Sequence, residues 1–197
     1  FDCTLHAALE NALDVPHTAF VHQGDFRGKR ERQPIEAVRR RIPDGIEIEY
    51  IGETPLTGEE RDADGKPITQ SHFDRFFMPS MAQVEYKTGD HSHLVTTLPH
   101  APISDFETRA FVVSCWRTPT ATEDARPGLE AYLDNILGQD VQILRQQTEN
   151  IRRFGGEAYR STDVDLAGPE IWRMLRQAER GLDPNAADID CRVKLTV

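Results

Sequence analysis

Apolar side chains recur at helical spacing near the start of the chain. Within residues 4–14 they occupy the spacing of one helix face, at Leu5, Ala8, Leu9, Ala12 and Leu13. Pro16 interrupts this pattern, so the helix is predicted to end near residues 14–15. A second short helical segment, with Pro16 in its first turn, is expected to run through His22.

From about residue 34 the apolar period changes from helical to alternating. Segments 36–42 and 46–52 flank Asp44–Gly45, which is typical of a β-hairpin. The polar segment 53–70 predicts an exposed loop. Further strands are predicted at 73–78, 81–88, 93–99 and 108–117, with 101–106 as a turn or loop. The short connections indicate an antiparallel sheet.

The helical period returns late in the chain. A long helix is predicted from Pro127 to about Arg153, and Gly155–Gly156 ends it. Another helix is predicted at 169–180. A helix, an antiparallel sheet and a long helix, in that order, predict one α+β domain over residues 1–197, with a curved sheet around the long helix. A chain of 197 residues is suited to one domain.

Composition narrows the possible partners. The formal net charge of −10 argues against nucleic acid, and the basic run 27–32 is interpreted as a solvated loop. No apolar stretch approaches the roughly 20 residues that span a bilayer and no signal peptide is visible, so no membrane partner is expected. Three widely spaced cysteines favour a reducing, cytoplasmic setting: Cys3, Cys115 and Cys191.

Two histidines near the amino end are candidate metal ligands. His17 and His22 lie five residues apart, and Asp14 precedes the first by three. Neutral imidazole binds divalent iron, zinc or copper, and a nearby carboxylate can fix its tautomer. On an ideal helix this spacing turns about 140° beyond a full circle, so convergence requires a broken helix, which Pro16 and Gly24 allow. The lack of a His-Glu-x-x-His pattern disfavours a zinc protease.

A third ligand is expected from a distant element. Asp140 stands on the long helix among Ile143, Leu144 and Gln147, so its carboxylate should face the core and need a partner. Two histidines and one carboxylate leave open coordination positions for oxygen and substrate. Asp134 is the main rival carboxylate, and Glu149 is a weaker one.

The sequence resembles the catalytic domain of Rieske non-haem iron oxygenase alpha subunits. The likeness rests on Asn-x-x-Asp-x-x-His-(x)4-His and on Gln-Asp more than a hundred residues later, in LDVPHTAFVHQG and GQDVQILRQQ. The segment LVTTLPHAPISDFETRAFVVSCWR is similar to the sheet strands of that family. The closer likeness is to the vanillate demethylase, phthalate dioxygenase and pheophorbide oxygenase branch, and it covers nearly the whole chain.

The resemblance implies a fold and a role for each site residue. The fold would be a helix-grip domain, START or Bet v 1-like. His17, His22 and Asp140 would bind one ferrous ion, with Asn11 beside it. Asp14 would link His17, by hydrogen bonds, to a ligand histidine of a Rieske cluster in the neighbouring subunit. A homotrimer is implied in the same way.

A Rieske 2Fe-2S cluster needs Cys-x-His and Cys-x-x-His pairs, and none of the three cysteines fits either pattern. In the family the cluster lies N-terminal to the catalytic domain. The cluster is therefore expected on a domain absent from this chain or on another polypeptide. This chain alone is expected to lack turnover with an ordinary reductase.

Three functions are compatible with these features. The first is an oxygenase that takes electrons from a reductase through the Rieske domain, activates dioxygen, and hydroxylates or demethylates an aromatic or apolar small molecule. The second is a helix-grip module that binds a hydrophobic ligand without catalysis. The third, which the histidine spacing disfavours, is a zinc hydrolase with the same ligands.

Each candidate residue also has a purely structural interpretation. His17 and His22 could be partly buried histidines, Asp14 a helix cap, and Asp140 an exposed helix residue. His91 and His93 are interpreted as turn residues, while His100 could face a pocket. Five sheet residues are expected mainly in the core, with some of them and Phe20 lining a pocket: Phe73, Phe76, Phe77, Met78 and Met81.

Overall fold

The computed structural model describes residues 1–22, 24–25, 34–55, 61, 64–90, 92–118, 122–186 and 188–196. The basic run 27–32 and His91 lie outside these residues, so the interpretation of both stays a prediction. No helix in the described ranges combines the length and apolarity needed to cross a membrane.

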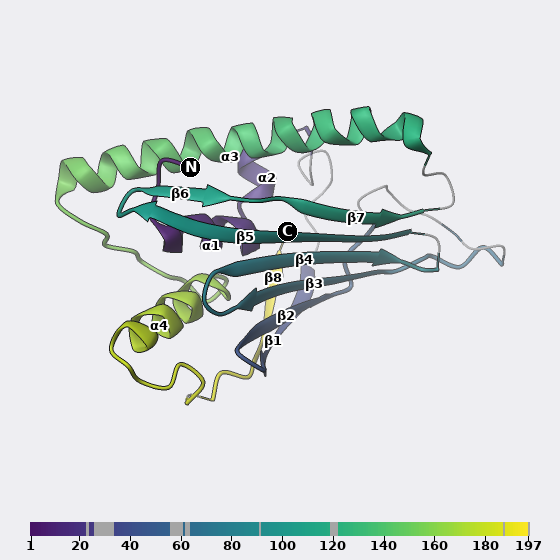
Figure 1. Ribbon diagram of the computed structural model, residues 1–197. Coiled ribbons are helices and arrows are strands. Elements are labelled where there is room, and N and C mark those ends of the chain that lie inside the picture. The colour runs from purple at the N-terminus through teal and green to yellow at the C-terminus, as the bar shows by residue number, and fades with distance from the viewer. Residues whose placement is uncertain are drawn as a thin grey trace.

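The strands of the described chain form one curved antiparallel sheet (Figure 1). Its order is β6-β5-β4-β3-β2-β1-β8, and β7 also pairs with β5. The strands are β1 (Pro34–Ile42), β2 (Gly45–Ile51), β3 (Gln70–Phe77), β4 (Met81–Thr88), β5 (Ser92–Ser104), β6 (Glu107–Ala110), β7 (Val113–Arg117) and β8 (Cys191–Thr196). The predicted α+β class with a curved antiparallel sheet is confirmed.

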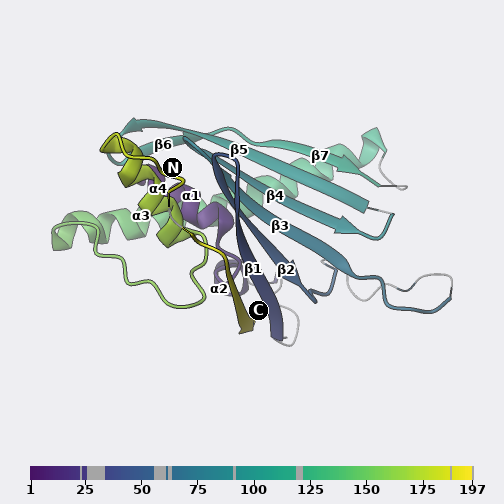
Figure 2. The ribbon, with the colours of Figure 1, turned by 90° about the horizontal axis from the view of Figure 1, so that it is seen from below.

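The helices lie on one side of this sheet, as Figure 2 shows from below. They are α1 (Leu5–Leu13), α2 (Thr18–Val21), α3 (Arg126–Phe154) and α4 (Gly168–Glu179), with a short 3-10 turn, η1 (Glu123–Ala125), before α3. Helix α1 contacts β3, β4 and β5, whereas α3 contacts α1 and α2. The long helix is therefore attached to the sheet mainly through the two short helices.

Two apolar clusters hold the helices in place. In the larger one, Leu9 and Leu13 of α1 pack with Ile171 and Met174 of α4 and with Phe76 of β3. In the smaller one, Leu144 of α3 packs against α1 and the residues before it: Cys3, Ala7 and Ala8. Leu144 follows Asp140 by one helical turn, so this contact also fixes where the Asp140 side chain lies.

The predicted hairpin between β1 and β2 is confirmed. Ile42 pairs with Gly45, so Pro43 and Asp44 form the loop, and Asp44 has a positive φ of 54°. Gly45 begins β2 beside β3, where an added Cβ would lie 2.0 Å from the carbonyl oxygen of Phe76. This close approach requires glycine at position 45.

Three local predictions were wrong. Residues 101–106 were expected to be a turn or loop, but β5 continues to Ser104 and pairs with β6. The single strand expected at 108–117 is divided at residues 111–112 into β6 and β7. His93 lies within β5 and contacts Glu85 on the neighbouring strand, not in a turn. Strand β8, which pairs with β1, was not predicted at all.

A buried ion cluster lies on the inner face of the sheet. His72 is fully buried between the rings of Tyr50 and Tyr86, at centroid distances of 4.5 and 4.2 Å. Its Nδ1 lies 2.9 Å from Glu53 and its Nε2 lies 3.0 Å from Asp74. Burial lowers the pKa of His72, but Asp74 and Glu53 outweigh it and raise the pKa. A charged imidazole therefore joins two buried carboxylates.

Replacing this histidine should destabilise the domain strongly. The substitution His72→Phe keeps a ring between the two tyrosines but leaves Glu53 and Asp74 buried without the imidazole that both contact. Its expected cost is about 3–5 kcal/mol in the free energy of unfolding, measured by urea denaturation. The control Arg192→Ala removes an exposed ion pair with Glu36 and should cost less than about 1 kcal/mol. Equal, small losses in both variants would contradict a charged His72.

Candidate metal centre

The two candidate histidines are brought together by a break between α1 and α2. Asp14, the C-cap of α1, has extended backbone angles, φ −93° and ψ 99°. His17 precedes α2 as its N-cap, and His22 follows it as its C-cap. This turn replaces the continuous helix on which a five-residue spacing would separate the rings, and their centroids lie 5.1 Å apart.

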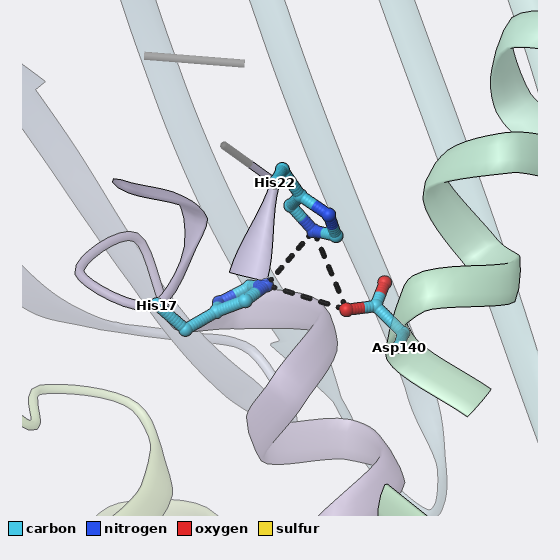
Figure 3. A group of neighbouring side chains, drawn as sticks. All are labelled: His17, His22 and Asp140. Carbon is cyan, nitrogen blue, oxygen red and sulfur yellow. Dashed lines mark hydrogen bonds and ion pairs between the residues drawn. The ribbon is translucent and has the colours of Figure 1, made fainter. Parts of the chain in front are cut away.

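Asp140 reaches the same point from α3. Its Oδ1 lies 3.5 Å from His17 Nε2 and 3.3 Å from His22 Nε2, and the two Nε2 atoms are 3.2 Å apart. Figure 3 shows the two rings and the carboxylate directed at one another from separate elements. These are the residues of the described chain whose donor atoms form a possible metal-binding group, all within 4.8 Å of one another.

The outer nitrogen of each ring has a hydrogen-bond acceptor. His17 Nδ1 faces the backbone oxygen of Asp14, so it donates its proton there. His22 Nδ1 lies 2.7 Å from Gln139 Oε1. The Gln139 amide is oriented by Asp25, which accepts from its Nε2 at 3.2 Å. Each ring thus has a fixed acceptor for its Nδ1 proton and directs its Nε2 inward, which is the orientation of metal-ligating histidines.

This arrangement places three electron-rich atoms face to face. Asp140 is buried, and its Oδ1 has no hydrogen bond among the described residues. Two imidazole lone pairs and a carboxylate oxygen at these distances repel one another unless a proton or a cation lies between them. A divalent cation satisfies all three at once, so the donor set fits a metal ion with nitrogen and oxygen ligands.

The electrostatics of the site are consistent with a cation. Burial raises the pKa of Asp140, but contacts with His17, His22 and Asn11 outweigh it and lower the pKa to about 2. Burial lowers the pKa of His17, yet Asp14 and Asp140 outweigh it and raise the pKa to about 9. The centre therefore favours an ionised carboxylate together with a positive charge, which a proton or a metal can supply.

The other candidate residues take different places. Asp14 accepts the His17 backbone N–H at 3.1 Å with Oδ2, which lies 3.5 Å from His17 Nδ1. Asn11 contacts Asp140 and lies beside the two histidines. The rival carboxylates Asp134 and Glu149 are exposed on α3. The structure thus assembles the predicted group, while its role as a ligand set stays a prediction.

A cavity of about 390 Å³ opens onto the three candidate ligands. Its α3 wall consists of Leu129, Tyr132, Leu133, Ile136 and Leu137, which precede Asp140 on the same helix. The opposite wall is the inner face of β3, β4, β5 and β7, and it includes His100 and Trp116. Such a mostly apolar space with a few polar groups is typical of a small-molecule site.

The sheet residues expected mainly in the core, and Phe20, do not contribute to the lining of this cavity. Phe76 is fully buried in the core, and Phe20 is 60% exposed. Neither Phe73 nor Phe77 is among the cavity-lining residues of the described chain. His100, for which the sequence offered no specific support, does line it.

A second cavity of about 530 Å³ also borders His17. Its walls are more polar and include Asn11, Asp14, Gln146, Asn150 and Arg160. His17 and Asn11 line both cavities. His17 therefore adjoins both a mostly apolar space and a more polar one.

Gln139 is a functional candidate that the sequence did not identify. It joins His22 to Asp25, while the neighbouring Asn135 and Tyr132 also bond to Asp25 from α3. The adjacent Gln-Asp pair was visible in the sequence. Its meaning depends on the contact with Asp25, more than a hundred residues away, which no local pattern reveals.

The chain was compared with protein-family models and with curated proteins. The family model described as the vanillate O-demethylase oxygenase C-terminal domain matches residues 1–181. No curated protein matches the chain significantly.

Several solved structures share the fold. NdmA of Pseudomonas putida CBB5 with caffeine is 18% identical, with a TM-score of 0.67 over 91% of this chain and 49% of that chain. NdmB of the same organism is 15% identical, with a TM-score of 0.65 over 98% and 53%. Dicamba monooxygenase bound to 3,6 dichlorosalicylic acid is 15% identical, with a TM-score of 0.64 over 91% and 56%. The chain thus spans about half of each of these structures.

The role of Gln139 can be tested with a metal probe. In Gln139→Leu the His22 ring loses its acceptor, so its tautomer is no longer fixed. Affinity for Co²⁺, followed by its absorption spectrum, should fall by about 10–100-fold. The control Gln142→Leu changes an exposed glutamine on the same helix and should leave the affinity unchanged. Equal affinities in the two variants would show that Gln139 does not orient a ligand.

Proposed function

Because the chain belongs to the vanillate O-demethylase oxygenase C-terminal domain family, we propose that it is a Rieske oxygenase catalytic domain that binds one ferrous ion through His17, His22 and Asp140. The observation that carries the proposal is that the two Nε2 atoms and Asp140 Oδ1 converge at distances of 3.2–3.5 Å. When bound, a ferrous ion with these ligands supplies open coordination positions and the redox chemistry of dioxygen activation.

The apolar cavity supports a small-molecule substrate. It opens onto the proposed ligands, and α3 and the sheet enclose it. These walls exclude water and hold an apolar molecule close to the centre, which is the contribution of binding geometry to such a reaction. Two solved relatives carry caffeine and 3,6 dichlorosalicylic acid. A small aromatic or apolar molecule, hydroxylated or demethylated here, is therefore the proposed substrate class.

Asp14 and the polar cavity support an electron route. Asp14 contacts His17 through both its backbone oxygen and its carboxylate, and it lines the polar cavity. A hydrogen-bonded carboxylate there can join His17 to a ligand histidine of a Rieske cluster on another domain. We propose that electrons from a reductase reach the centre by this route, in a homotrimer of the whole protein. Without that domain, the chain alone should bind iron but show no turnover.

The alternative of a hydrophobic-ligand module without a metal draws on the same cavity. That alternative does not account for a carboxylate buried against two imidazoles, because a carrier of apolar ligands has no use for a buried polar group that needs a proton or a cation beside it. A zinc hydrolase would use the same donor set, so the identity of the bound metal separates it from the oxygenase.

Iron binding tests the proposal directly. Anaerobic loading should give close to one Fe²⁺ per chain by metal analysis after desalting. His17→Ala and Asp140→Ala each remove one of three ligands and should abolish this binding. Asp134→Ala is the matched control, since it removes an exposed carboxylate from the same helix, and it should retain the wild-type iron content.

Two outcomes would count against the function. A folded wild-type chain that binds no iron anaerobically, or iron binding that survives both ligand substitutions, would exclude this site. Tight binding of an apolar ligand that is indifferent to chelators and to His22→Ala would favour the ligand-carrier alternative.

A further inference from the structure

The turn that follows the proposed ligand His22 places Asp25 beside helix α3. The backbone N–H of Asp25 donates to the carbonyl oxygen of His22 at 3.2 Å, and Gly24 has a positive φ of 92°. A positive φ at the third position of a four-residue turn favours glycine. The chain therefore reverses directly after the ligand, and the Asp25 side chain meets α3 at Gln139.

Three residues of α3 donate hydrogen bonds to Asp25. Its Oδ2 accepts from Asn135 Nδ2 at 3.0 Å and from Gln139 Nε2 at 3.2 Å, and its backbone oxygen accepts from the Tyr132 hydroxyl at 3.3 Å. Positions 132, 135 and 139 share one face of the helix. These contacts therefore hold the turn against the helix that supplies the third proposed ligand, Asp140.

The two ends of the Gln139 amide differ in their hydrogen bonding. The oxygen only accepts and the nitrogen only donates. The oxygen lies 2.7 Å from His22 Nδ1, and the nitrogen lies 3.2 Å from Asp25 Oδ2. A carboxylate oxygen also only accepts, so Asp25 determines which end of the amide faces His22.

A metal bound at Nε2 of His22 requires this direction of the amide. An imidazole that gives its Nε2 lone pair to a cation carries its remaining proton on Nδ1. If the Gln139 amide were turned round, its NH₂ group would face that N–H, and two donors would meet with no acceptor between them. The carboxylate of Asp25 opposes this turn, so its effect reaches His22 through Gln139.

We propose that Asp25 is a positioning residue of the metal centre, which fixes the Gln139 amide and thereby supports the metal-binding state of His22. This inference rests on the proposed function and extends the site to a residue that acts through Gln139. The chain segment after His22 is then part of the metal centre, because it supplies the acceptor that orients the ligand.

A simpler role for Asp25 would be a latch between the turn and α3. A latch needs hydrogen bonds but no carboxylate, since an amide oxygen at position 25 could accept from Asn135 equally well. The backbone contact with Tyr132 does not depend on the side chain at position 25. Asp25→Asn therefore keeps the latch, whereas it offers Gln139 both a donor and an acceptor and so allows its amide to turn.

Co²⁺ binding, followed by its absorption spectrum, measures the effect of Asp25 on the ligand. Asp25→Asn should weaken the binding about 10-fold, at the lower end of the range for groups that orient a metal ligand. The control Asp134→Asn makes the same change at an exposed carboxylate of α3 and should leave the affinity unchanged. Equal affinities in the wild type and Asp25→Asn, or an equal loss in Asp134→Asn, would overturn the inference.

The ring N–H of His22 provides a readout that a latch would not change. In the Co²⁺-loaded chain, NMR should show two strongly shifted signals that exchange with water, from the Nδ1 protons of His17 and His22. One of them should exchange faster in Asp25→Asn and in Gln139→Leu. Asn135→Leu, which removes only a latch contact, should leave both signals unchanged. Unchanged signals in Asp25→Asn, or an equal effect of Asn135→Leu, would contradict the proposed role.

A double variant tests the route from Asp25 to His22. If Asp25 acts through Gln139, adding Asp25→Asn to Gln139→Leu should lower the Co²⁺ affinity no further than Gln139→Leu alone. A further loss of about 10-fold would show an independent effect, and the inference would be wrong.

Metal binding by the wild-type chain separates this inference from the proposed function. A chain that binds Fe²⁺ and Co²⁺ equally well with and without Asp25→Asn keeps the function and loses this inference. A chain that binds Co²⁺ with the expected dependence on Asp25, but no Fe²⁺, keeps this inference and loses the function. A folded chain that binds neither metal loses both.

Discussion

One electrostatic constraint governs the architecture around the candidate centre: a buried carboxylate oxygen and two imidazole nitrogens need a positive charge between them. The three atoms face one another at 3.2–3.5 Å. Each imidazole is oriented by an acceptor for its other nitrogen, the Asp14 backbone oxygen or Gln139. The surrounding fold therefore stabilises an arrangement that is unfavourable unless a positive charge occupies its centre.

Several elements of the fold serve this arrangement. The break between α1 and α2 brings two histidines together that a continuous helix would separate. Leu144 packs α3 against α1 and so fixes the position of Asp140 one turn earlier. Because α3 contacts the short helices more than the sheet, a cavity remains between the long helix and the strands. The same attachment thus positions a ligand and leaves space for a substrate.

Much of this could be predicted from the sequence where the signal is local. The long helix follows from its 3.6-residue period, and Asp140 was preferred over Asp134 because its neighbours are apolar. Gln139 could not be recognised, because its role depends on Asp25 across the fold. Residues 101–104 were assigned to a loop, yet pairing with β6 extends β5 through them. Strand β8 depends on β1, about 150 residues earlier in the chain, so no neighbouring segment indicates it.

The sequence also did not show which face of the sheet lies against the cavity. Alternation shows which residues share a face, but it does not show which face is covered. The aromatic residues of β3 were therefore all expected mainly in the core, where Phe76 does lie, whereas Phe73 lies on the outer face under Arg75.

X-ray absorption at the iron edge of the Fe²⁺-loaded chain tests the central claim most directly. Two imidazoles and oxygen ligands are predicted; a spectrum without imidazole scattering would contradict the account.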